Sequence, residues 1–236
     1  MTCWQRSSNR LREAVHLPLG FADYGEVHCL QRQLHARRLR GEIPDTVLTV
    51  EHPPVITIGR RGSVENVLVS SEALKAEGIA IYEVERGGDV TYHGPGQLVV
   101  YPIVDLRDLG CDLRWYIRNL EQAVIDLLCD LGVVAERRHG LPGVWVNGRK
   151  IASVGVYVKH WVTYHGLALN VCVNKAHFRM IRPCGMQIEV TSLEEIVKGG
   201  CLLDEVAAGL LARMEALFGW RLVAGDPSAF REGNRP

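Results

Sequence analysis

Arg86-Gly-Gly-Asp-Val-Thr-Tyr-His-Gly-Pro-Gly-Gln97 carries four glycines and a proline between two apolar runs, residues 79–84 and 98–104. The β-branched and aromatic content of these runs, and their short length, predict two strands. Glycine is favoured where the backbone turns with positive φ or lies against a ligand, and the central Thr-Tyr-His supplies hydrogen-bonding side chains. We interpret the stretch as a loop that hangs from a sheet, either a ligand-binding loop or a long hairpin connection.

Outward from this stretch, hydrophobic spacing predicts short strands and a few helices. Apolar residues three and four apart indicate helices, and β-branched runs bounded by Gly or Pro indicate strands. After Gly219 we expect the chain to fray into a polar tail. The sequence predicts helices over residues 23–40, 71–78, 112–131 and 203–218, and further strands over residues 46–50, 55–58, 144–146, 151–158 and 161–171.

Asn147-Gly148 is the clearest turn in the chain, because Asn-Gly between two apolar runs is typical of a two-residue β-hairpin. Lys150 therefore falls at the start of the second strand of that hairpin. This strand carries small residues, Ala152, Ser153 and Gly155, where a packed strand normally carries large ones. We expect something other than its own side chains to fill the space beside it.

These elements predict the α/β class with a mixed sheet, not a regular βαβ alternation. No Pro/Ser-rich linker, charge block or repeat divides the chain, so we expect one catalytic domain over residues 1–236, with its core at roughly residues 15–220 between polar ends. A nucleotide-binding fingerprint is missing. Gly94-Pro-Gly96 lacks the third glycine of the dinucleotide loop, and the sequence has no Gly-Lys-Ser/Thr.

Composition excludes several classes of protein. The 236 residues carry 27 basic and 27 acidic side chains, so no overall field attracts nucleic acid or an anionic membrane. The first ten residues lack the apolar region of a signal peptide, and no apolar run is long enough to span a bilayer. We expect a cytoplasmic protein.

The seven cysteines form an odd, dispersed set without Cys-x-x-Cys, which is not a disulfide framework. Most of them, including Cys129, are expected to be small buried hydrophobes. The nine histidines do not follow metal-ligand spacing, since His160 and His165 are five apart in an apparent strand. We therefore expect no metal and no cofactor.

Cys184 has different surroundings from the other cysteines, because Pro183 and Gly185 place it at a tight turn. A thiol with a pKa near 8.5 needs a neighbouring cation or base to act as a nucleophile at neutral pH. Lysine is scarce in this arginine-rich chain, and a lysine can lose a proton where an arginine cannot. Lys150 and Cys184 are a candidate dyad, with a purely structural role for both as the alternative.

Five sequence blocks stand out in chain order: Arg86 to Gln97 as quoted above, Gly148-Arg-Lys-Ile-Ala-Ser-Val-Gly155, Trp161-Val-Thr-Tyr-His-Gly-Leu-Ala-Leu-Asn170, Pro183-Cys-Gly185 and Thr191-Ser-Leu193. With these blocks, in this order, the sequence resembles the bacterial lipoyl (octanoyl) transferases, also called lipoate-protein ligase B. The flanking Glu51-His-Pro-Pro54 and Ile58-Gly-Arg60 match the family as well, so the likeness covers roughly residues 15–220.

This resemblance implies a biotin/lipoyl protein ligase-like fold, with a larger mixed sheet flanked by helices and a smaller second sheet. It implies octanoyl transfer from the thioester of acyl carrier protein to a lysine of lipoyl domains in 2-oxoacid dehydrogenase E2 subunits or of the glycine-cleavage H protein. Cys184 would be the acyl-thioester nucleophile and Lys150 its activating base. The implied substrate-binding residues are Arg86, Gly87, Gly88, Asp89, Val90, Thr91, Tyr92, His93, Ser153, Val154, Gly155, Gly166, Leu167 and Ala168.

Two other functions remain open from the sequence. The first is an ATP-dependent lipoate or biotin ligase of the same fold, which needs no cysteine. The second is a non-catalytic module that binds an acyl chain or a carrier protein. Arginines at positions 32, 37, 38 and 40, at 60 and 61, and at 137, 138 and 149 are either solvated surface or a docking patch for an acidic carrier.

Overall fold

The computed structural model describes residues 11–200 and 202–230. Within these residues, the longest strands form one mixed sheet in the order β11-β1-β2-β6-β10-β9-β8-β7. Strands β11, β1 and β2 run parallel, and the pairs from β2–β6 to β7–β8 are antiparallel. The strands are β1 (Arg12–Phe21), β2 (Asp45–Glu51), β6 (Gln97–Ile103), β7 (Glu136–Arg138), β8 (Leu141–Val146), β9 (Arg149–Lys159), β10 (Val162–Asn170) and β11 (Trp220–Ala224).

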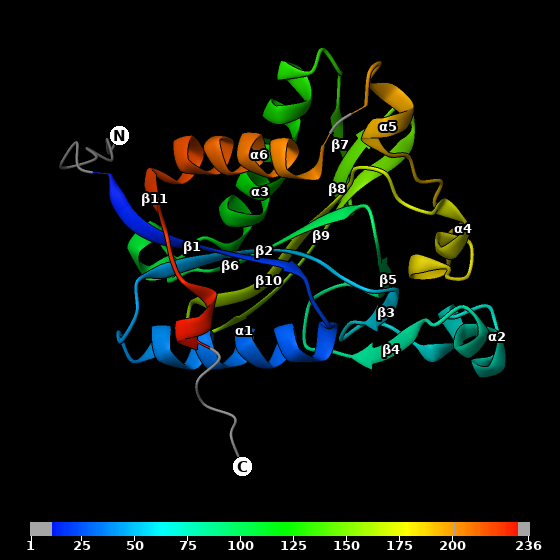
Figure 1. The fold of residues 1–236 in the computed structure, drawn as a ribbon, viewed down its shortest axis with the longest axis horizontal. Helices are drawn as coiled ribbons and strands as arrows, with labels where there is room; N and C mark the ends of the chain where they lie inside the picture. The colour runs from blue at the N-terminus through cyan, green and yellow to red at the C-terminus, as the bar shows by residue number, and fades with distance from the viewer. Residues whose placement is uncertain (1–10, 201, 231–236) are drawn as a thin grey trace.

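Helices cover both faces of this large sheet. Figure 1 shows α1 (Tyr24–Leu39) along one face, and α3 (Leu113–Asp130) and α6 (Leu203–Phe218) along the other. The Asp112 carboxylate accepts a hydrogen bond from the Trp115 N–H and caps α3. The apolar stripe of α3 packs with α6 against the sheet, as its spacing predicts.

A smaller sheet lies beside the large one, in the order β4-β3-β5. Its strands are β3 (Val55–Ile58), β4 (Ala80–Glu83) and β5 (Val90–His93), and it packs near α2 (Ser71–Ala76) and α4 (Lys175–Phe178). The predicted α/β class, with a larger mixed sheet, flanking helices and a smaller second sheet, is confirmed. The remaining short elements are η1 (Val64–Asn66), η2 (Leu106–Leu109), η3 (Pro183–Gly185), α5 (Leu193–Ile196) and η4 (Pro227–Phe230).

The glycine-rich stretch is not the simple loop that we predicted. Its middle forms β5, which pairs antiparallel with β3 in the small sheet. The strands before and after it, β4 and β6, belong to different sheets, so a hairpin connection between them is wrong. The stretch carries the chain from the small sheet to the large one, with glycine-containing segments on both sides of β5.

The hairpin at Asn147-Gly148 is confirmed, since β8 and β9 are antiparallel and Asn147 and Gly148 have φ of 48° and 83°. These positive values suit the two central residues of a type I′ turn. Lys150 is the second residue of β9, as expected. Strand β10 then pairs antiparallel with β9 across a turn at His160 and Trp161.

Two expectations, about the C-terminal end and the cysteines, are wrong, and one N-terminal strand was not predicted. The chain does not fray after Gly219, because β11 follows at once and pairs with β1, a strand that the sequence analysis did not predict. Four cysteines that were expected to be buried, Cys29, Cys111, Cys129 and Cys172, are exposed, and none of these four forms a disulfide.

The described part of the chain contains no helix long and apolar enough to cross a membrane.

Candidate functional site

Three adjoining cavities run inward between the small sheet, β9 and β10. An outer cavity of about 490 Å³ shares Phe178, Ile181, Ile188 and Val190 with a middle cavity of about 80 Å³. The middle cavity shares Thr91, Ser153 and Val154 with an inner cavity of about 40 Å³. Because each cavity shares lining residues with the next, the three form one route from the surface toward the large sheet.

Lys150 lines the middle cavity and is fixed there by two backbone hydrogen bonds to the neighbouring segment at residues 189–191. Its N–H donates to the Glu189 carbonyl at 2.8 Å, and its carbonyl accepts from the Thr191 N–H at 3.0 Å. The ammonium nitrogen lies 5.4 Å from the centre of the Trp145 ring, within cation–π range. Gly143 on β8 leaves room for this side chain, since a Cβ there would lie 2.6 Å from Lys150 Cε.

The turn that carries Cys184 borders the same cavity. Pro183, the first residue of η3, lines the middle cavity together with Lys150. The Arg182 N–H donates to the Asn66 carbonyl at 2.8 Å, which ties the turn to η1, and Gly185 ends it with φ of 69°. The predicted tight turn is confirmed for the backbone, whereas the Cys184 side chain lies outside the described part of the structure.

Arg86 holds the first glycine segment against the small sheet. Its buried guanidinium donates to the Thr57 carbonyl at 2.7 Å and to the Thr57 hydroxyl at 2.8 Å. The Gly87 N–H donates to the Val156 carbonyl, which binds this segment to β9. A Cβ on Gly155 would lie 3.1 Å from the Gly87 carbonyl oxygen. At Gly155, therefore, the space beside the small-residue strand is filled by the glycine segment.

Most of the predicted binding residues line a cavity, and four do not. These four form hydrogen bonds within the protein: Gly87 as described above, Gly88 with the Arg61 N–H, Asp89 with Asn66 Nδ2, and Tyr92 with His177 Nδ1. Val90 lines the middle cavity. The others line the inner cavity, and these are Arg86, Thr91, His93, Ser153, Val154, Gly155, Gly166, Leu167 and Ala168.

His93 is a neutral hydrogen-bonding group at the wall of the inner cavity. Gln97 Nε2 donates to Asn170 Oδ1 at 2.9 Å, so Gln97 Oε1 is an acceptor and the His93 Nδ1–H donates to it at 2.7 Å. This pattern leaves His93 Nε2 with a free lone pair. Burial lowers the pKa of His93 to about 3, so the ring is uncharged at neutral pH.

Several cavity residues were absent from the sequence prediction. Tyr101 and His165 line the inner cavity, and an apolar set lines the middle and outer ones: Phe178, Ile181, Ile188 and Val190. His165 directly precedes the predicted Gly166, so its place beside the binding residues was a usable signal. The apolar set gives no local signal, because its residues look like any small satellite core.

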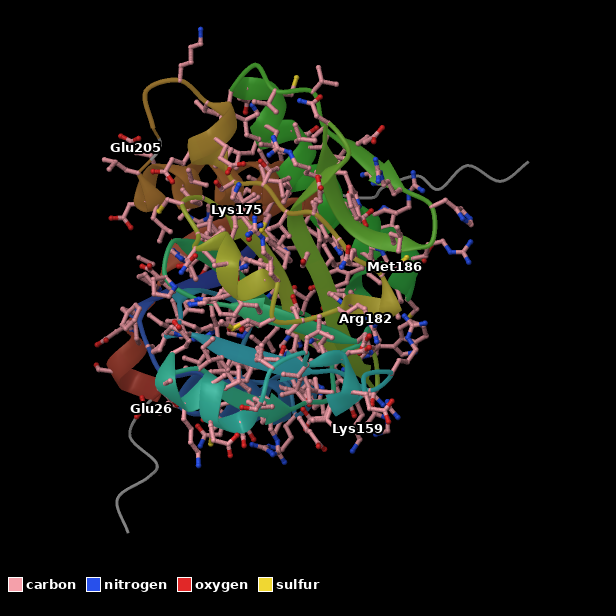
Figure 2. All side chains as sticks on the ribbon, turned by 90° about the vertical axis from the view of Figure 1, so that its right-hand side faces the viewer. Glu26, Lys159, Lys175, Arg182, Met186 and Glu205 are labelled. Carbon is pink, nitrogen blue, oxygen red and sulfur yellow. The ribbon has the colours of Figure 1, made fainter. Side chains whose placement is uncertain are left out.

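Basic side chains surround the outer cavity. Arg149, Lys175 and Arg179 line it, and Glu195 forms ion pairs with Arg149 at 3.0 Å and with Lys175. Figure 2 looks onto this end of the molecule and shows Lys175 on α4, with Arg182 and Met186 in the segment around η3. The outer cavity is therefore bordered by basic side chains, by the Glu195 carboxylate that pairs with two of them, and by apolar side chains.

Comparison with known sequences gives matches over most of the chain. Residues 23–215 match the family model of the lipoyl protein ligase A/B catalytic domain. The octanoyltransferase of Syntrophobacter fumaroxidans is 47% identical over 209 residues, which cover 88% of this chain and 92% of that relative. The octanoyltransferase of Solibacter usitatus is 47% identical over 216 residues, which cover 91% of this chain and 97% of that relative.

Solved structures show the same fold at low identity. Lipoate-protein ligase A bound with ATP has a TM-score of 0.71 at 17% identity and covers 94% of this chain and 93% of its own. A putative lipoate protein ligase from T. acidophilum has a TM-score of 0.70 at 17% identity, with 93% of both chains covered. The expected ligase-like fold is thereby confirmed.

Proposed function

Because this chain belongs to the octanoyltransferases of the lipoyl protein ligase A/B catalytic family, we propose that it moves an octanoyl (or lipoyl) group from acyl carrier protein to a lysine of a lipoyl domain. The reaction would be the first committed step of protein lipoylation. The observation that carries the proposal is the middle cavity, in which Lys150 and the Cys184 turn meet through Pro183. A nucleophile placed on that turn would act where the route from the surface opens toward the inner cavity.

In the first half-reaction, Cys184 attacks the carbonyl carbon of the donor thioester. A protonated Lys150 favours the Cys184 thiolate, because a neighbouring positive charge lowers the pKa of a thiol. The new bond joins the octanoyl carbon to Cys184 sulfur, and the bond to the carrier's phosphopantetheine sulfur breaks. The departing thiolate takes the proton from Lys150, which leaves an octanoyl-enzyme and a neutral lysine.

In the second half-reaction, the acceptor lysine attacks the octanoyl-enzyme. Its amine forms an amide with the octanoyl carbon, the bond to Cys184 sulfur breaks, and Lys150 takes the proton that the amine loses. Lys150 therefore ends protonated beside a thiolate, ready for the next donor. His93 Nε2 is the alternative proton acceptor, but a pKa of about 3 makes it a far weaker base than Lys150. A thioester converts to an amide downhill, so the reaction needs neither ATP nor a metal.

The inner cavity, together with the middle cavity that adjoins it, is the proposed site of the octanoyl chain. Ser153, Val154 and Leu167 line it, with the backbone of Gly155 and Gly166 beside them. Burial of each CH₂ contributes roughly 0.8 kcal/mol, so an apolar cavity gives a long acyl chain a clear advantage over a short one. The proposed acceptors are lipoyl domains, among them those of 2-oxoacid dehydrogenase E2 subunits, and the glycine-cleavage H protein.

Intact mass spectrometry tests the proposed acyl-enzyme. The protein is incubated with octanoyl-carrier protein in the absence of ATP, and the adduct is located by peptide mapping. We expect one octanoyl group per chain on the peptide that contains Cys184, and none in Cys184→Ala or Cys184→Ser. The exposed Cys29, Cys111 and Cys129 provide matched controls, and their alanine variants should acylate and transfer normally.

Other outcomes identify the alternatives. Transfer that depends on ATP and free octanoate would indicate a ligase that works through an acyl-adenylate. Donor binding without an adduct or transfer would indicate a non-catalytic carrier-binding module. An adduct that persists in Cys184→Ala would place the nucleophile elsewhere.

A further inference from the structure

Two histidines and a glutamate from distant parts of the chain meet away from Lys150. His28 lies on α1, Glu85 follows β4, and His165 lies on β10, and one ligand atom from each is within 4.8 Å of the others. His28 Nε2 is 3.0 Å from Glu85 Oε2, and His165 Nε2 is 3.9 Å from the same oxygen. The His28 and His165 rings lie nearly parallel with their centres 5.4 Å apart. All three side chains therefore present donor atoms to one small volume.

His165 is the unusual member of this group. Its side chain is 2% exposed, and Nε2 has no hydrogen-bond partner among the described residues. The 3.9 Å separation from Glu85 is too long for a hydrogen bond. His165 also has φ of 56° inside a strand, a strained conformation for a residue other than glycine. Glu85 forms only a long ion pair with this buried, strained imidazole, which leaves the nitrogen able to take a further ligand.

We propose that His28, Glu85 and His165 bind a divalent transition-metal ion of the Zn²⁺ class. Two imidazole nitrogens and one carboxylate oxygen are a ligand set that zinc accepts, with a fourth position left for water or another ligand. In a tetrahedral site with bonds of about 2.0–2.2 Å, neighbouring ligand atoms lie roughly 3.3–3.5 Å apart. The His28–Glu85 pair at 3.0 Å and the His165–Glu85 pair at 3.9 Å fall on either side of this range, and the two imidazole nitrogens lie within 4.8 Å of each other, so the side chains must draw together to complete the site.

The exposure of the three ligands shows from which side an ion could enter, and their positions show which elements it would join. The Glu85 side chain is 37% exposed, whereas His165 is closed off, so the ion enters from the Glu85 side. His165 and Arg86, which follows Glu85, both line the inner cavity. A bound ion would join α1, the end of β4 and β10 beside this wall, where the Arg86 guanidinium, of the same positive sign as the ion, also acts on His165.

The sequence predicted no metal site, because its histidines do not follow metal-ligand spacing. His28 and Glu85 are 57 residues apart in the chain. Only the packing of α1 against β10 and the small sheet brings these ligands together, so linear spacing gives no sign of them.

Metal titration of the full chain tests this site separately from the acyl transfer. The protein carries Cys184→Ala so that the proposed nucleophile cannot bind the metal, and it is freed of metal with a chelator. Calorimetric titration with Zn²⁺ should give one ion per chain, and the midpoint of thermal unfolding should rise with Zn²⁺ concentration. Co²⁺ in place of Zn²⁺ should give visible absorption bands of nitrogen and oxygen ligation. A sulfur-to-cobalt charge-transfer band would overturn the proposal, since it would show that a cysteine binds the ion.

Matched variants locate the binding. His28→Gln and Glu85→Gln should each weaken Zn²⁺ binding by about tenfold or more and remove the thermal stabilisation. The exposed His139 gives the control, and His139→Gln should bind as the parent does. An unchanged affinity in both His28→Gln and Glu85→Gln, or no one-to-one binding in the parent, would overturn the proposal. Neither result would affect the proposed octanoyl transfer, which uses Lys150 and Cys184.

Discussion

Lys150 depends on a glycine of the neighbouring strand for its position. Gly143 has φ of 126°, and its N–H donates to the buried Glu121 carboxylate at 2.9 Å. The Lys150 stem packs over this position, where a side chain would collide with it. The absence of a side chain at Gly143 therefore decides where Lys150, the proposed base, lies.

Lys150→Arg should lose octanoyl transfer nearly as completely as Lys150→Ala. Arginine keeps the positive charge that favours a thiolate, but it cannot accept the proton of the acceptor amine. General acid–base catalysis typically contributes about 10²–10⁴-fold, and we expect a loss of that size in kcat for amide formation. The adjacent Arg149→Lys, measured in the same assay, controls for a change of basic residue at this place. Normal turnover by Lys150→Arg would show that the charge alone suffices.

Gly143→Ala should destabilise the protein and lower kcat together. A Cβ there would lie 2.3 Å from the Ala152 carbonyl oxygen and 2.6 Å from Lys150 Cε, so β9 or the lysine must move. We expect a loss of roughly 1–3 kcal/mol in the free energy of unfolding, measured by urea denaturation. Gly140→Ala is the matched control, because Gly140 also has positive φ (76°) but no atom near the added Cβ. Equal effects of the two substitutions would show that backbone strain, not the collision, is responsible.

At the scale of elements, β11 completes the edge of the large sheet. It pairs with β1 in register from Arg12–Trp220 to His16–Ala224. Trp220 is 1% exposed and stacks on Phe218 of α6 with ring centres 4.5 Å apart. The short turn at Gly219, with φ of 66°, lets the chain leave α6 and enter this strand.

Trp220→Ala should reduce the free energy of unfolding by about 3–5 kcal/mol, because it removes a large buried ring and leaves a cavity between α6 and the sheet. Chemical denaturation measures this loss. Phe21→Ala at the far end of β1 is the control, since Phe21 is 61% exposed and its loss should change stability by less than about 0.5 kcal/mol. A small effect of Trp220→Ala would mean that β11 contributes little to the sheet.

For the whole molecule, the junction of the two sheets contains a buried histidine that stays neutral. His52 Nδ1–H donates to the Ala22 carbonyl, and its Nε2 accepts from the Tyr101 hydroxyl at 3.1 Å. Tyr24 from α1 and His93 from β5 pack against its ring. Burial lowers the pKa of His52 to about 4.

Acid should destabilise the protein through this histidine. The unfolded chain takes up a proton at His52 below about pH 6.5, whereas the folded protein resists it until about pH 4, so stability falls as the pH falls through this window. The loss for one such group is on the order of 3 kcal/mol. Urea denaturation at several pH values should show a shallower dependence for His52→Gln than for the parent. Parallel curves for the two proteins would contradict this assignment, and Asp23 is the charged neighbour to examine next.

Most of the arginines that the sequence offered as a docking patch for a carrier protein are already in ion pairs. Arg38 is committed to Asp45, Asp105 and Asp108, and the same holds for Arg137, which pairs with Glu121. Arg60 and Arg61 differ, since they are exposed and no ion pair joins them within the described residues. Their N–H groups donate to the carbonyls of Arg86 and Gly88, so both lie beside the glycine segment.

Reversal of Arg60 and Arg61 to Glu should raise KM for octanoyl-carrier protein, because acidic carriers are attracted by exposed positive charge. Added salt should weaken the parent in the same way, since the Debye length is about 8 Å at physiological ionic strength. A small octanoyl thioester should be used equally well by both proteins. Reversal of the exposed Arg114 and Arg118 on α3 controls for net charge. Parallel losses with both donors would place the defect in folding or chemistry.

The sequence by itself determined the elements that carry a local signal. Three such elements are the apolar stripe of α3, the Asn147-Gly148 hairpin and the Pro183-Cys-Gly185 turn. Each lies within one short segment, so its sequence pattern can be recognised without knowledge of the rest of the fold. The signature blocks named Lys150, Ser153 and Gly166 as site residues; Lys150 and Ser153 line the middle cavity, and Ser153 and Gly166 line the inner one. The roles of these residues remain proposals.

Only the tertiary structure decided how distant segments pair. It made a strand of the glycine-rich stretch, added β11 to β1, exposed the cysteines and brought His28, Glu85 and His165 together. Strand β5 lies between pairs of glycines and β11 follows Gly219, so each looked like part of a loop or a tail, and each forms because a neighbouring strand supplies its hydrogen bonds. Contacts between segments far apart in the chain depend on which sheet edges are open and which helix faces are apolar in the folded protein. No local sequence pattern contains that information.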